Sequence, residues 1–116
     1  MSKISFEGIG EVAVTFLAEG KVSTGEVVSL AGDGTVKAAG QGERFFGVAV
    51  SEDKAGCAAV QTGGFAQVKC ADSTVSVGYV KLTGDGDGGV KKAGTGDQGG
   101  EYAVVSAGDG VITIKM

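Results

Sequence analysis

The chain lacks histidine, proline and tryptophan, and it has only two cysteines among 116 residues. Without histidine, the commonest general base and the usual hydrolytic triads are missing. Two thiols with no imidazole cannot complete a four-ligand zinc site within one chain. Buried free thiols are the favoured interpretation of Cys57 and Cys70, with a disulfide as the alternative. We therefore expect a protein that is not an enzyme and has no cofactor or metal.

Clusters of basic residues and long apolar runs are also missing. The net charge is −4, and the 10 lysines and arginines are scattered along the chain. Binding to nucleic acid needs several cations aligned against phosphates, so we expect no nucleic-acid partner. No stretch approaches the roughly 18 apolar residues of a membrane helix, and no apolar segment follows Lys3 as in a secretory signal. We expect no membrane contact, and synthesis in a reducing cytoplasm.

Glycine is abundant instead, with 23 residues that separate short runs of Val, Ile, Phe and Thr. Glycine supplies the positive φ of tight turns, and Asp-Gly between β-prone runs is a strong hairpin signal. No window has a helical apolar stripe. We expect strands at 26–30, 35–38, 45–50, 58–61, 65–70, 77–82, 89–92, 102–105 and 111–116. The sequence thus predicts an all-β fold, a small barrel-like or sandwich domain of short antiparallel strands.

An internal duplication organises these strands. The segment 21–27 resembles 74–80, with matching Val, Ser and Gly positions, and 36–40 resembles 90–94. Two related hairpin units, neither able to bury its apolar face alone, would pack into one closed or nearly closed β-body. We expect a single domain over 1–116, with an N-terminal strand or arm at 1–18, a first repeat at 19–70 and a shorter second repeat at 71–116.

Acidic and glycine-rich segments could carry chemistry, but each has a plainer interpretation. Asp85 and Asp87 sit in a stretch that superficially resembles a calcium loop, yet the flanks are strand-like and the glutamate at the twelfth position is missing, so a hairpin turn is favoured. The neighbouring Glu52 and Asp53 would point to opposite faces of a strand. No helix follows the Gly-x-Gly at 40–42, as phosphate binding would need. An enzyme is left only if carboxylates from distant strands converge.

A repeated theme of glycine, a hydrophobic pair, a Gly-Asp-Gly turn and Gly-Val-Ala runs through residues 25–28, 32–36 and 46–49, and returns in part at 77–86. It resembles the small capsid cement, or head decoration, proteins of tailed phages and prophages, over about residues 19–116. The resemblance implies a β-barrel-like or sandwich body on the outer capsid surface of the virion, which strengthens the shell. It implies the major capsid protein and further copies of the chain as partners, commonly in trimers, and no catalytic residue.

Members of that family often reach the capsid subunit with an N-terminal arm. Here the alternating segment 4–16 is either such an arm or a strand of the body. The candidate partner contacts are Ile4, Phe6, Ile9 and Phe45.

Aromatic residues later in the chain leave further questions open. Phe45 and Phe46 place one ring on each face of a strand, so one should be core and the other should meet a second sheet or a partner. Tyr79 and Tyr102 are expected to be half-buried strand tyrosines, with a place at an interface as the alternative. The alternative functions are another phage structural component, of the tail or neck, and a small β-barrel ligand-binding module with a roomy apolar pocket.

Overall fold

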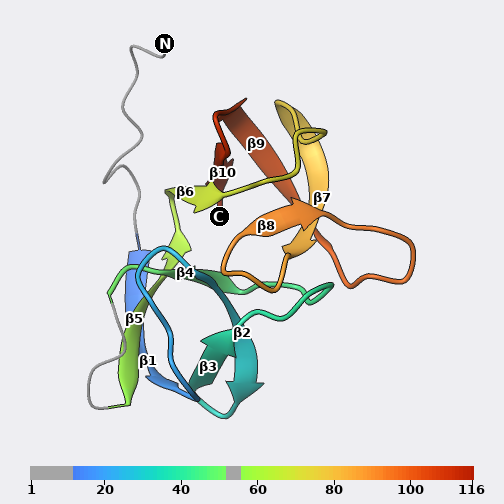
Figure 1. Cartoon of the computed structure of the whole chain (residues 1–116). Coiled ribbons are helices and arrows are strands. Elements are labelled where there is room, and N and C mark those ends of the chain that lie inside the picture. The colour runs from blue at the N-terminus through green and yellow to red at the C-terminus, as the bar shows by residue number, and fades with distance from the viewer. Residues whose placement is uncertain (1–11, 52–55) are drawn as a thin grey trace.

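Strands form the regular structure of the described residues. The computed structural model describes residues 12–51 and 56–116, which form ten strands and no helix (Figure 1). The first five are β1 (Val12–Ala18), β2 (Val27–Gly32), β3 (Thr35–Ala38), β4 (Gly47–Ala49) and β5 (Cys57–Gly63). The last five are β6 (Phe65–Lys69), β7 (Gly78–Gly84), β8 (Val90–Lys92), β9 (Gly100–Gly108) and β10 (Val111–Lys115). The expected all-β class is confirmed.

The first five strands close into a small barrel in the order β1-β3-β2-β4-β5. Strand β1 lies antiparallel to β5 and parallel to β3, where Leu17 is opposite Thr35. This parallel pair departs from the expectation of antiparallel strands alone. It arises because β3 turns back from β2 through Asp33-Gly34, and closure of the ring then brings β3 against β1. Closure pairs both edges of this sheet, which removes the exposed edges that invite aggregation.

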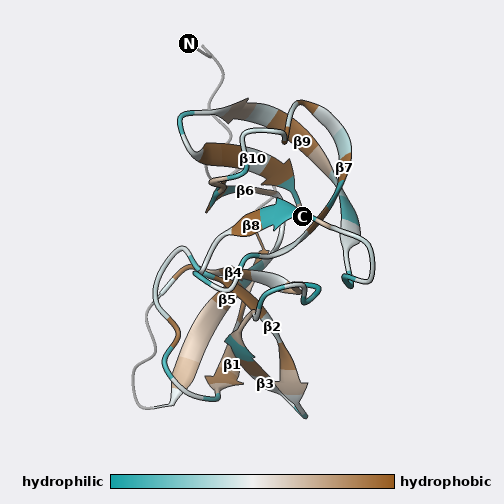
Figure 2. Ribbon diagram, turned by 45° about the vertical axis from the view of Figure 1, so that its right-hand side comes forward, coloured by the Kyte–Doolittle hydropathy of each residue, from teal (hydrophilic) through white to brown (hydrophobic). Residues whose placement is uncertain are grey.

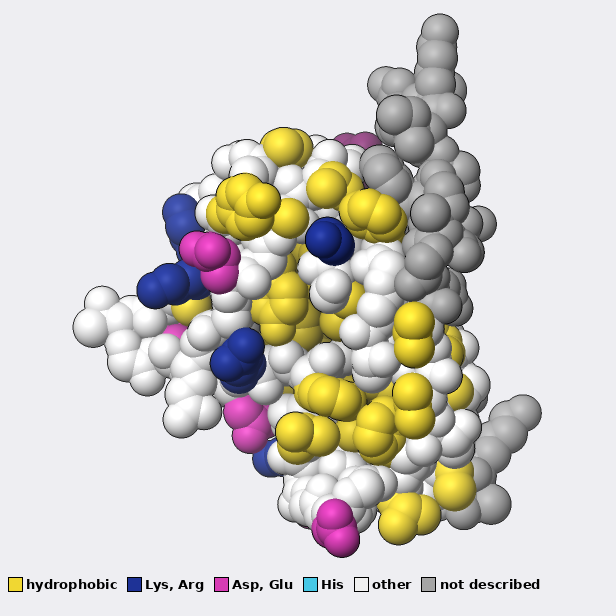
Figure 3. All heavy atoms as spheres, turned by 180° about the vertical axis from the view of Figure 1, so that it is seen from behind, with side chains coloured by type: hydrophobic (Ala, Val, Ile, Leu, Met, Phe, Trp, Pro, Cys, Tyr) yellow, Lys and Arg dark blue, Asp and Glu magenta, His cyan; other side chains and the backbone are white. Residues whose placement is uncertain are grey.

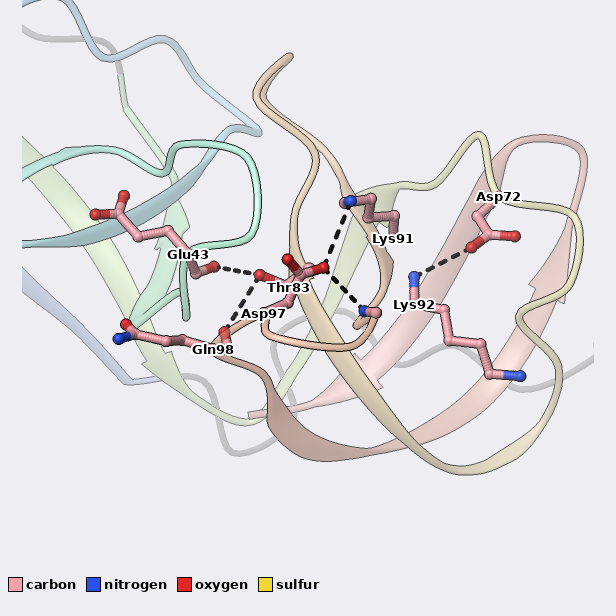
Figure 4. Close-up of polar contacts among 8 residues, drawn as sticks. Glu43, Asp72, Thr83, Lys91, Lys92, Asp97 and Gln98 are labelled. Carbon is pink, nitrogen blue, oxygen red and sulfur yellow. Dashed lines mark hydrogen bonds and ion pairs between the residues drawn. The ribbon is translucent and has the colours of Figure 1, made fainter.

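The last five strands form a second sheet in the order β6-β10-β9-β7-β8. If β6 to β10 are taken as counterparts of β1 to β5, this is the barrel order with the ring opened between β6 and β8. Near that opening, the carboxylate of Asp72 accepts the backbone N–H of Lys92 at 3.2 Å (Figure 4). The chain passes from the barrel to the second sheet at Gly64, between β5 and β6. A common strand order is what a duplicated unit would give, and the duplication with its boundaries at 19–70 and 71–116 stays a prediction.

Two apolar clusters form the core of the protein. One lies inside the barrel and includes Val36 and Val60. The larger one takes side chains from both sheets, among them Val48 from the barrel and Leu82 and Ile114 from the second sheet. Figure 2 shows the hydrophobic segments distributed along strands of both sheets. Full burial of each such side chain contributes about 1.5–3 kcal/mol, so the shared cluster joins the sheets into one body.

The Asp-Gly turn between β9 and β10 has the geometry that its sequence predicts. Asp109 and Gly110 have φ angles of 56° and 77°, and the ladder resumes with Val111 opposite Gly108. Two central residues with positive φ form the type I′ turn, whose twist matches that of the flanking strands. Asp109 is the non-glycine residue with positive φ among the described residues.

Candidate interaction surface

The carboxylate of Asp85 binds its own turn in the 84–89 segment. Asp85 Oδ1 accepts the backbone N–H of Asp87 at 2.7 Å and that of Gly89 at 3.1 Å. The carboxylate thus closes a turn, as the hairpin interpretation requires. Across residues 12–51 and 56–116, no three His, Cys, Asp or Glu side chains are grouped so that they could hold a metal ion. The same residues contain no helix long and apolar enough to cross a membrane.

In the barrel half of the chain, the carboxylate of Glu43 stabilises the loop that follows β3. It accepts the backbone N–H of Gly40 at 2.8 Å and the hydroxyl of Ser29 at 3.0 Å, and it pairs with Lys37 Nζ at 3.2 Å. These contacts, the Gly40 N–H above all, lower the pKa of Glu43. Glu43, which directly follows the Gly-x-Gly at 40–42, therefore has a structural role.

Asp97 has the equivalent role in the second unit. Its carboxylate accepts the backbone N–H of Gly94 at 2.8 Å and pairs with Lys91 Nζ at 3.6 Å (Figure 4). The two loops also meet, because the backbone N–H of Gln98 donates to the carbonyl of Gly42 at 2.9 Å. Both carboxylates thus stabilise loops at the seam, as we call the contact between the barrel and the second sheet.

Phe45, expected as a partner contact, lies inside this seam. It is 2% exposed, and its ring stacks on Tyr102 with centroids 4.5 Å apart and planes 9° apart. The Tyr102 hydroxyl donates to the carbonyl of Phe45 at 2.9 Å, and burial raises the pKa of Tyr102. Phe46 is the more exposed of the two phenylalanines, at 38%, and packs edge-to-face on Phe16 at 5.5 Å.

Ile4, Phe6 and Ile9 lie outside the described residues, as do Glu52 and Asp53.

A cavity of about 470 Å³ opens at the seam beside the aromatic pair. It is lined by Leu30, Glu43, Arg44, Phe45, Phe46, Gln98 and Tyr102. Its volume is in the range of small-molecule sites, about 300–1,000 Å³, which rely on a few polar groups to orient the ligand. The carboxylate of Glu43 and the hydroxyl of Tyr102 are already bonded to the protein. Arg44 and Gln98 supply the remaining polar side chains of the lining.

The Cys70 thiol lacks the environment of a reactive cysteine. Cys57 and Cys70 are both free. Cys70 is buried, with Sγ 3.6 Å from the carbonyl oxygen of Asp72, and burial raises the pKa of its thiol. A raised pKa reduces the population of thiolate, which is the nucleophilic form. Cys70 therefore acts as a small core residue.

The face of the second sheet that is turned away from the core combines apolar and basic side chains. Strand neighbours that lie opposite each other share a face. Tyr79 is opposite Ala103, which is opposite Lys115, and Lys81 is opposite Glu101 in the next row. The outer sheet face, as we call it, includes Phe65, Lys69, Tyr79, Lys81, Glu101, Ala103, Val111 and Lys115, and the exposed Val77 lies just before the start of β7. Figure 3 shows hydrophobic side chains gathered around basic ones over this half of the molecule.

Tyr79 corrects the expectation of two half-buried tyrosines. Tyr102 is partly buried in the seam, whereas Tyr79 is 79% exposed and Val77 beside it is 67% exposed. The alternation of the strand contains the signal, because Val80 and Leu82 face the core and Tyr79 must then face away.

Comparisons with known proteins identify a fold. No family model matches the chain, and no curated protein matches its sequence. Among solved structures, the chain is similar to the N base of the head fibre protein gp8.5 of bacteriophage phi29, with a TM-score of 0.62 and 22% sequence identity. The match covers 91% of this chain and 93% of that one. The two proteins share a fold that extends over both sheets.

Proposed function

We propose that the chain is a phage or prophage virion structural protein that binds and stabilises the outer capsid surface, as a head decoration or cement protein. The observation that carries this proposal is the shared fold with the base of the phi29 head fibre, which extends over 91% of the chain. The sequence theme of decoration proteins, found in the repeats, supports the same role. The major capsid protein is the proposed partner.

This role depends on surface contacts and needs no reactive group. The carboxylates of Glu43, Asp85 and Asp97 already bind backbone or lysine partners, and the Cys70 thiol is buried. Many copies on one capsid lattice would gain strength through avidity, since each added contact becomes effectively intramolecular. We propose a homo-oligomer, a trimer, as the unit that matches a symmetric site on the shell.

Sedimentation with phage heads tests the proposal directly. Heads are prepared from the phage or prophage that encodes the chain, with its gene deleted, and are mixed with purified protein. We expect the protein to sediment with the heads and to saturate at a fixed number of copies per capsid subunit. Protein that stays in the supernatant at every concentration contradicts head decoration, and protein that binds purified tails instead supports a tail or neck role.

The oligomeric state is measured separately by light scattering. The chain has a mass of 11.4 kDa, and we expect three times this mass in solution. A single-chain mass contradicts the trimer and leaves head binding to be judged by sedimentation.

A further inference from the structure

We propose that the outer sheet face is the surface that docks on the partner, and that it fits a protein surface on which carboxylates surround an apolar patch. The inference rests on the proposed function and names the surface that carries it out.

The first observation is the number of exposed apolar side chains on this face. Tyr79 and Val77 are each more than two-thirds exposed, and Val111 is 43% exposed. Side chains on the opposite face of the same strands, such as Val80 and Leu82, pack on the core. Exposed tyrosine beside aliphatic residues is typical of interface centres, where a rigid ring gains contact area at a small entropic cost.

The second observation is the charge on this face. Lys69, Lys81 and Lys115 extend from it, and Glu101 is its acidic residue. In contrast, the second unit carries its aspartates in the turns and loops, as at Asp72, Asp85, Asp87, Asp97 and Asp109. A chain of net charge −4 thus presents one sheet face with an excess of positive charge.

Within the described residues, the lysines of this face form no ion pair. The ion pairs formed among residues 12–51 and 56–116 are Lys37–Glu43 and Lys91–Asp97. Lys115 lies directly between Ala103 and Phe65 in the ladder, with no carboxylate opposite it. Within the described part of the chain, its charge is thus not neutralised by a carboxylate.

These charges select one kind of occupant. This face carries three lysines and one glutamate, so two copies that meet through it would bring two surfaces of net positive charge together, which is unfavourable. A polyanion such as DNA would match the lysines but not the apolar centre, since nucleic-acid surfaces are recognised mainly through phosphate contacts. An acidic protein surface with an apolar centre matches both features.

Two variants of the face and two matched controls test the inference by sedimentation with the heads described above. Tyr79→Ser removes the most exposed ring, and Leu17→Ser removes a leucine that is 57% exposed on the barrel strand β1. Lys115→Glu reverses a charge on the face, and Lys21→Glu makes the same reversal on the exposed chain between β1 and β2. All four positions are at the surface, and thermal unfolding confirms that each variant is folded.

We expect the two face variants to bind heads about tenfold more weakly or worse, and the two controls to bind like the unchanged protein. Binding of the unchanged protein should also weaken as sodium chloride rises from about 0.05 M to about 0.5 M, because salt screens the lysines.

Three outcomes overturn the inference in distinguishable ways. Equal binding by face variants and controls rejects this face and leaves head decoration standing. Tight binding of a double-stranded DNA fragment, lost in Lys115→Glu, identifies a polyanion as the occupant. No head binding by the unchanged protein removes the proposed function, and the inference with it.

Discussion

The two neighbouring phenylalanines, Phe45 and Phe46, provide the sharpest test of how the sheets are joined. Phe45 is 2% exposed and stacks on Tyr102 across the seam, whereas Phe46 is 38% exposed and has one edge-to-face contact. Truncation of a buried phenylalanine to alanine costs about 3–5 kcal/mol, and loss of the stacked pair adds about 0.5–1.5 kcal/mol. Phe45→Ala should therefore remove a large part of the roughly 5–15 kcal/mol expected for a domain of this size. For Phe46→Ala we expect about 1–2 kcal/mol, since much of its ring area stays in water.

Urea unfolding, followed by circular dichroism at one fixed protein concentration, measures both changes. With a slope of about 1–3 kcal/mol per M, the midpoint should fall by about 2 M for Phe45→Ala and by less than about 1 M for Phe46→Ala. The fixed concentration matters because an oligomer gains apparent stability by mass action. Equal shifts, or a larger shift for Phe46→Ala, would refute the assignment of Phe45 to the shared core.

Two further predictions concern a turn and the pH dependence of stability. Asp109 has a φ of 56°, so Asp109→Ala should lower the free energy of unfolding by about 1 kcal/mol, whereas Asp109→Gly should be nearly neutral, as measured by urea unfolding. Folding lowers the pKa of Glu43, chiefly through the Gly40 N–H, and that of Asp72, chiefly through Thr74. Their contribution is therefore complete above the unfolded pKa of about 4 and is lost as the pH falls through the lower folded values. The urea midpoint should drop in that acid range, and Glu43→Gln should make the drop smaller; an equal drop in the variant would contradict a stabilising role for Glu43.

Local signals in the sequence predicted the local structure well. Asp-Gly pairs between β-prone runs marked the β2–β3 and β9–β10 turns, because positive φ at such positions is a property of a few residues. Alternation of side chains marked the strands but not which face of each strand is buried. Sequence alone could not decide between Phe45 and Phe46, since the choice depends on the register of β4 and on Tyr102, which is far away in the chain.

Long-range contacts could not be predicted from the sequence for the same reason. The parallel pairing of β1 with β3 depends on closure of the barrel, which no local pattern encodes. Tyr102 lies against the barrel loop that contains Phe45, a contact between residues 57 positions apart that no local pattern encodes. The residues of the outer sheet face could be identified only once the order of the strands was known.

The unequal distribution of the two apolar clusters has a consequence for how the chain acquires its structure. The barrel has an interior of its own, built from residues such as Val36 and Val60, whereas the described core residues of the second sheet all belong to the cluster that both sheets share. The barrel is therefore expected to close around an interior of its own, whereas the second sheet buries its described core residues against the barrel.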